Sequence, residues 1–127
     1  MAEIGSVSFF PLSYSPLNAV TLRLIGQGSA GSGVWVDTDE VRIAMGRVFR
    51  ARFARKSVRS IGRDTAFVDG WGVHGWRGRW LVNGSSSGMV RLDLEPEVRA
   101  RVLGVPVRLS ALRVSLTTPD ELIRVLS

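Results

Sequence analysis

The sequence predicts a mostly β protein: a single antiparallel β-barrel or sandwich of about seven strands with a short C-terminal α-helix. Apolar residues recur at every second position in several short segments, which is the period of a half-buried strand. Segments rich in glycine, serine and asparagine separate them, as turns separate strands. With 127 residues, the chain is expected to form one domain over residues 1–127.

The first predicted strands lie in the N-terminal third of the chain. An edge strand is expected near Phe9, ended by Pro11, and a second strand over residues 20–24. A Gly/Ser-rich turn follows over 26–33. Alternating apolar residues over 34–45, interrupted by Asp-Thr-Asp, predict a tight hairpin.

The next segment alternates strictly between large apolar and basic residues. Phe49, Ala51 and Phe53 are expected to face the core, which places Arg50 and Arg52 on the solvent side. This is the clearest strand pattern in the basic part of the chain.

The Trp- and Gly-rich stretch predicts a second hairpin. Its first strand would turn one face inward and expose Arg77 and Arg79, and its second strand would cover 90–94 across the turn Asn83–Gly88. The inward residues of the first strand are Trp76, Gly78, Trp80 and Val82.

The C-terminal part predicts a reversal, a strand and a helix. Pro96 is expected to end the preceding strand, with a short turn or helix over 97–103 and a strand or bent pair over 107–116. A capping box from Thr118 to Glu121, with Pro at the first helical position, then begins a helix of about two turns.

The order of these elements resembles the bacterial pleckstrin-homology (PH)-like domains. The resemblance is carried by GWRGRW followed by NGSSSGMVRL and by the ending LRVSLTTPDELIRVL, and it covers residues 34–127. It implies a PH-like barrel closed by the helix, here shorter than is usual in that family. The first hairpin loop, Asp37–Glu40, is acidic and would repel an inositol phosphate, so the resemblance does not imply recognition through that loop.

Basic residues dominate the charge and cluster in one run. The net charge is +6, and of the 17 basic residues only Lys56 is not arginine. Between Arg47 and Arg63 seven basic residues precede the first acid, Asp64. Such a run is either a solvated strand face or a surface for an anionic partner.

Candidate contact residues follow from these patterns. Arg50 and Arg52, joined by Arg77 and Arg79 if both pairs share a sheet face, would form a basic surface. Trp71 is the tryptophan most expected to be exposed, and the only histidine, His74, is most simply a loop residue. Ser85 and Ser86 could donate to an anion from the turn or belong to a flexible hairpin turn.

Several functional classes find no support in the sequence. With no cysteine and one histidine, neither a metal site nor a cofactor is expected, and no catalytic spacing is present, so an enzyme is not predicted. No apolar run approaches the roughly 18 residues that span a bilayer, and the acidic N-terminus is unlike a signal peptide. A cytoplasmic protein, free or associated with a membrane, is expected.

The sequence therefore leaves three functions open. The first is a non-enzymatic binding or scaffold module that contacts a protein or an anionic surface through a basic sheet face and Gly/Trp-rich loops. The second is a small barrel enclosing a hydrophobic ligand or lipid, lined by Trp76, Trp80 and Met89 or Met45. The third, nucleic-acid binding, is disfavoured because the aromatics of the basic and Trp-rich segments are expected to face inward. Pairing of exposed strand edges would also permit a homo-oligomer.

Overall fold

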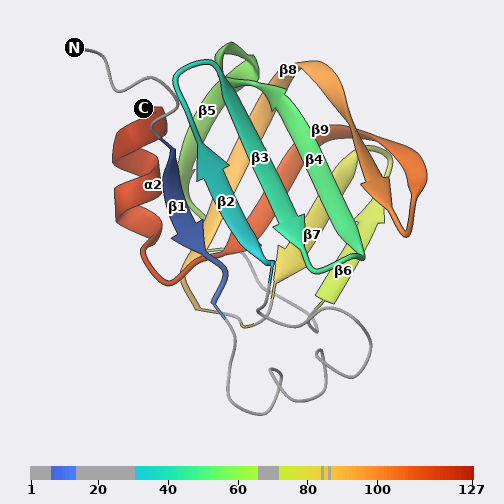
Figure 1. Cartoon of the computed structure of the whole chain (residues 1–127), viewed down its shortest axis with the longest axis horizontal. Helices are drawn as coiled ribbons and strands as arrows, with labels where there is room; N and C mark the ends of the chain where they lie inside the picture. The colour runs from blue at the N-terminus through green and yellow to red at the C-terminus, as the bar shows by residue number, and fades with distance from the viewer. Residues whose placement is uncertain (1–6, 14–30, 66–71, 84, 86) are drawn as a thin grey trace.

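A computed structural model describes residues 7–13, 31–65, 72–83, 85 and 87–127 of the chain. This part of the chain is mostly β, as predicted, and its nine strands form one sheet curled into a half-barrel (Figure 1). The sheet does not close as the predicted barrel would: within the described residues its path ends at β1 on one side and at β6 on the other. The strand predicted over 20–24 lies outside these residues.

The first four strands form an antiparallel meander. The edge strand and the hairpin over 34–45 are confirmed, because neighbouring strands pair in sequence order. The Asp37 carboxylate closes the β2–β3 turn by accepting hydrogen bonds from the amides of Asp39 and Glu40, at 2.8 and 2.7 Å. The four strands are β1 (Ser8–Pro11), β2 (Gly33–Val36), β3 (Glu40–Met45) and β4 (Phe49–Ala54).

Strand β8 (Met89–Val102) is shared by two strands on one edge. After β4 the chain passes through the 3-10 turn η1 (Arg55–Ser57) into β5 (Val58–Arg63), and β5 pairs with the first part of β8 while β4 pairs with its last part. A register shift between Asp93 and Val98 separates the two parts and contains the cis peptide Glu95–Pro96.

The prediction that Pro96 ends this strand was wrong. Residues 97–102 continue β8 instead of forming a turn or helix, because β9 (Val105–Ser115) pairs with them along the other edge. The chain reverses at Leu103 and Gly104, whose φ values of 51° and 80° suit a tight hairpin turn.

The second predicted hairpin was also wrong. Its supposed first strand is itself a hairpin of β6 (Gly72–Trp76) and β7 (Arg79–Asn83), turning at Arg77 and Gly78 with φ values of 53° and 83°. Two successive positive φ values are typical of a type I′ turn. The sequence did not indicate this turn, because the alternation over residues 76–82 continues through it without a break. Strand β9 lies between β7 and β8 and pairs with β7 in parallel, so the sheet is not entirely antiparallel.

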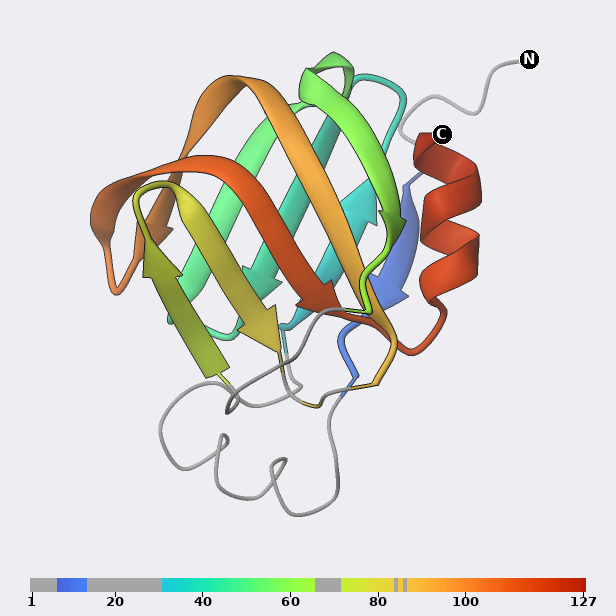
Figure 2. The same cartoon turned by 180° about the vertical axis from the view of Figure 1, so that it is seen from behind.

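The core fills the concave side of the sheet, and the C-terminal helix covers one margin of it. Helix α2 (Pro119–Leu126) lies beside β1 and β5 in both views (Figures 1 and 2) and buries Leu122 completely. The predicted helix is confirmed, although the Thr118 side chain makes no capping hydrogen bond. No helix among the described residues is long and apolar enough to span a membrane. The largest fully buried side chains are Phe49, Ile43, Met45, Leu92, Leu109, Leu112, Leu116 and Leu122.

Truncating Leu122 tests how much the helix contributes to stability. Because its side chain is 0% exposed, Leu122→Ala should lower the free energy of unfolding by about 2–5 kcal/mol, measured by urea denaturation. Arg124→Ala, at an exposed position of the same helix, is the control and should change it by less than about 0.5 kcal/mol. Equal urea midpoints for Leu122→Ala and the wild type would show that the helix is not part of the cooperative core.

Candidate anion-binding groove

Alternation along β3 and β4 positions a set of arginines on the outer face of the half-barrel. Val41, Ile43, Phe49, Ala51 and Phe53 are at most 5% exposed and fill the concave side. Because side chains alternate across a strand, their neighbours Arg42, Arg50 and Arg52 are exposed on the opposite face, as the sequence predicts for the last two.

Strand register aligns these arginines with others from β8. In one cross-strand row, Trp35 lies opposite Arg42, which lies opposite Arg52. In a second row, Ala44, Arg50, Arg101 and Pro106 follow one another across β3, β4, β8 and β9. Directly opposed residues have Cβ atoms only about 5 Å apart, so these rows place arginines of three strands next to one another on one face.

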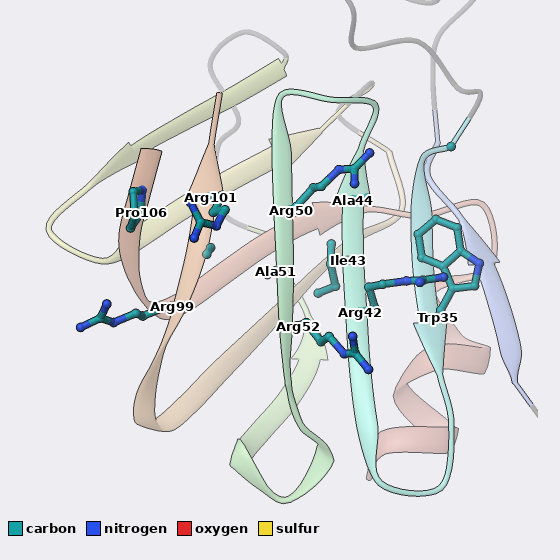
Figure 3. Close-up of a pocket in the computed structure, with 12 residues that line it drawn as sticks. Trp35, Arg42, Ile43, Ala44, Arg50, Ala51, Arg52, Arg99, Arg101 and Pro106 are labelled. Atoms are coloured by element: carbon teal, nitrogen blue, oxygen red, sulfur yellow. The ribbon is translucent and has the colours of Figure 1, made fainter. Parts of the chain in front are cut away.

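The rows border an open groove of about 580 Å³, here called the arginine groove (Figure 3). Five arginines line it, and no acidic residue of the described part of the chain does. The small side chain of Ala44, opposite Arg50, leaves room on this face. Arg42 extends from β3 toward the Trp35 ring at one side of the groove, while Arg99 and Arg101 project from β8 (Figure 3). The lining residues are Gly31, Trp35, Arg42, Ile43, Ala44, Arg50, Ala51, Arg52, Arg99, Ala100, Arg101 and Pro106.

The five arginines differ in whether their guanidinium groups have a partner within the protein. Arg42 stacks over the Trp35 ring, with its Cζ atom 4.7 Å from the ring centroid. Arg52 binds both carboxylate oxygens of Glu40 at 2.6–2.9 Å, and Arg101 donates to the Gly104 carbonyl at 2.9 Å.

Arg50 and Arg99 differ from these three. Both are exposed, and the guanidinium group of neither forms a hydrogen bond or an ion pair with any residue that the structure describes. Their guanidinium groups can therefore bind an external anion without breaking a contact of this part of the fold.

The acidic β2–β3 turn is engaged within the fold. The amides of Glu40 and Asp39 lower the pKa of Asp37, and Arg52 lowers the pKa of Glu40 through their hydrogen bonds. Arg55 joins this turn to the end of α2 by donating to the carbonyls of Asp37 and Val125, at 3.1 and 2.6 Å. The turn is thus held by hydrogen bonds within the fold and is linked through Arg55 to the end of α2.

A second charged cluster, on β5, β8 and β9, is internally paired. Arg91 bonds to Asp93 at 3.0 Å, Ser60 donates to the same carboxylate at 2.9 Å, and Arg113 contacts the largely buried Asp64. The hydrogen bond from Arg91 and then that from Ser60 lower the pKa of Asp93. No group of three or more potential metal-ligating side chains occurs in the part of the chain that the structure describes.

The predicted basic surface is only partly assembled. Arg50 and Arg52 line the arginine groove, but Arg77 lies in the β6–β7 turn and Arg79 on β7, which β8 and β9 separate from β4. These two pairs therefore do not share a patch. The basic run is also dispersed, since Arg59 pairs with Glu95 at 2.9 Å.

Two of the remaining candidates, Ser85 and His74, lie in the part of the chain that the structure describes. Ser85 is 7% exposed, and its hydroxyl bonds to that of Ser13 at 2.8 Å, so it belongs to the packed interior of the loop. His74 lies on β6 opposite Leu81. Trp71 and Ser86 are outside the described residues.

Three lining arginines escaped the sequence analysis. Arg99 and Arg101 belong to the segment expected to be a turn or helix, where no sheet face could be assigned. Arg42 alternates outward within the predicted hairpin, but only the register shows that it stands opposite Arg52. The sequence does contain a signal for Arg99 and Arg101, the alternation in EVRARV. If this segment is taken as a strand, the two arginines fall on one face.

Comparisons with protein-family models, curated proteins and solved structures find no match to this chain. The PH-like relationship therefore remains a prediction from the sequence.

Acid should destabilise the protein through these paired carboxylates. A carboxyl whose pKa is lowered in the folded state stabilises that state fully above its ordinary pKa, and this contribution is lost as the pH falls through the folded value. The ordinary pKa is 3.8 for Asp37 and Asp93 and 4.5 for Glu40. The urea midpoint of the protein should therefore stay constant near neutral pH and decrease once the pH falls below these values.

Asp93→Asn isolates one of these contributions. This variant should be less stable than the wild type at neutral pH and should lose less on acidification, because a neutral amide cannot titrate. Asp39→Asn, at an exposed turn position, is the control. Parallel acid profiles for Asp93→Asn and the wild type would contradict the assignment.

Proposed function

We propose that this protein is a non-enzymatic binding module whose arginine groove takes an anionic partner. The observation that carries the proposal is that five arginines from β3, β4 and β8 line one groove, with no acidic residue among the described residues that line it. Like charges held side by side repel one another, so a bound anion would relieve a cost that the folded protein carries alone.

The chemistry of the groove suits oxyanions. A guanidinium group presents a planar fork of donors that matches carboxylate and phosphate oxygens, and bonds to such charged acceptors are stronger than neutral ones. The volume of about 580 Å³ lies within the range of ligand sites in proteins. The net charge of +6 would attract such a partner at long range.

Two alternatives have weaker support. An enclosed hydrophobic ligand would need room beside Met45 and Met89, but these side chains are 0% and 4% exposed within the packed interior. Recognition through the first hairpin loop would need a basic loop, whereas Asp37 and Glu40 hold that turn together.

Absence of cysteine is compatible with action in the reducing cytoplasm.

Binding of inorganic polyphosphate, measured by isothermal titration calorimetry at low salt, tests the proposal. The double variant Arg50→Ala/Arg99→Ala removes the two groove arginines that have no partner among the described residues. Each lost charge-assisted bond weakens binding, and together they should reduce the affinity at least about tenfold.

Arg79→Ala/Arg124→Ala provides the matched control. It removes the same net charge from exposed positions outside the groove and should change the affinity by less than about threefold, the share due to long-range attraction. Equal losses in the two double variants would attribute binding to net charge alone and refute the groove as the site.

A further inference from the structure

We infer that the anionic partner is a single-stranded nucleic acid, an inference that rests on the proposed anion-binding role of the arginine groove. The added observation is an aromatic pair on the same outer face. Phe9 on β1 lies opposite Trp35 on β2, and their ring centroids are 5.0 Å apart with a tilt of 42°. Trp35 lines the groove directly.

This aromatic pair is built onto the outer surface. Phe9 is 50% exposed although phenylalanine usually belongs inside, while Phe10 next to it is 5% exposed and packs in the core. The Phe9 ring lies over Gly33, where any side chain would collide with it. Glycine at that position therefore allows an aromatic ring to lie against the strand beside Trp35.

Aromatics and arginines form one continuous row. It runs across the sheet from Phe9 through Trp35 and Arg42 to Arg52, and the Arg42 guanidinium already lies over the Trp35 ring. Nucleobases stack both on aromatic rings and on guanidinium planes, so a base can extend this stack or displace Arg42 from the ring. The phosphates would then meet Arg50, Arg99 and Arg101 in the groove.

The extent of the surface favours a chain over a single small anion. From β1 to β8 the surface formed by this row and the arginine groove crosses four strand spacings, about 19 Å along the sheet. The occupant must supply planar groups at one side and negative charges over the remainder. Because the outer face of the curled sheet is convex, a flexible strand can follow it, whereas a flat bilayer would touch only part of it (Figure 1).

The sequence-based argument against nucleic acid therefore loses one of its premises. Phe49 and Phe53 do face the core, at 0% and 5% exposure, as that argument assumed. The stacking groups come instead from Phe9 and Trp35, which lie outside the basic run in sequence but share a cross-strand row with its Arg52 through Arg42 of β3.

The experiment compares oligomers that carry the same phosphates with and without bases. Fluorescein-labelled dT and rU oligomers of about 15 nucleotides and an abasic oligomer of equal length would be titrated with the protein at fixed salt, by fluorescence anisotropy. The wild type should bind at least one of the base-bearing strands about tenfold or more tightly than the abasic one. The difference between dT and rU identifies DNA or RNA as the preferred strand.

Aromatic variants separate stacking from charge. Phe9→Leu should reduce the advantage of the base-bearing strand several-fold while leaving polyphosphate affinity unchanged, because Phe9 is not among the groove-lining residues. Trp35→Leu should independently reduce the same advantage several-fold. Leu103→Ala, at a side chain that is 73% exposed outside the groove lining, is the control and should change neither. Phe9→Leu keeps the test informative if Trp35→Leu fails to fold.

The possible results are distinguishable. Polyphosphate binding with equal affinities for base-bearing and abasic strands would overturn the nucleic-acid inference and leave the anion-binding module standing. A duplex bound as tightly as the single strand would also overturn it, because paired bases are not available to stack. Failure to bind polyphosphate and every oligomer would refute both proposals.

Discussion

The fold depends on the division of one edge of β8 between two strands. Its first half pairs with β5 and its last half with β4, while β9 pairs with both halves along the other edge. Strands β4 and β5 follow one another along that edge, with the 3-10 turn between them and the register shift of β8 near it. The sheet curls into a half-barrel with the core on its concave side, and the last part of β8 carries Arg99 and Arg101 to the arginines of β4.

Charge is distributed unevenly over the outer surface of this half-barrel. On β5, β8 and β9, arginines lie beside carboxylates, and Arg91 with Asp93 is one of several such pairs. On β3, β4 and the last part of β8 the arginines face one another across strands, and among the acidic residues that the structure describes only Glu40 pairs with a groove arginine. Surface ion pairs contribute little to stability, so the contrast bears mainly on the proposed binding role. The arginine groove is the surface where an external anion would find donors in excess.

Much of the local structure could be predicted from the sequence, because it depends on neighbours in the chain. Alternation placed Phe49 and Phe53 inside, and Pro119 with its acidic successors marked the start of the helix. The predictions were wrong where pairing with strands distant in the sequence determines the structure. The Arg77–Gly78 turn interrupts an alternation that continues unchanged through it, and Pro96 is accommodated because β9 and the two strands on the other edge hold β8 together on either side.

The candidate site divides in the same way. The sequence by itself determined that arginines would be exposed on β4 and that the protein would be basic, since side-chain period and net charge are properties of the chain. Only the tertiary structure decided which arginines meet. Register sets Arg50 beside Arg101 and Phe9 beside Trp35 through hydrogen bonds between segments far apart in sequence, and it sets Arg42 beside Arg52 between the neighbouring strands β3 and β4. No local pattern encodes such pairings, because they depend on which strands the whole chain brings together.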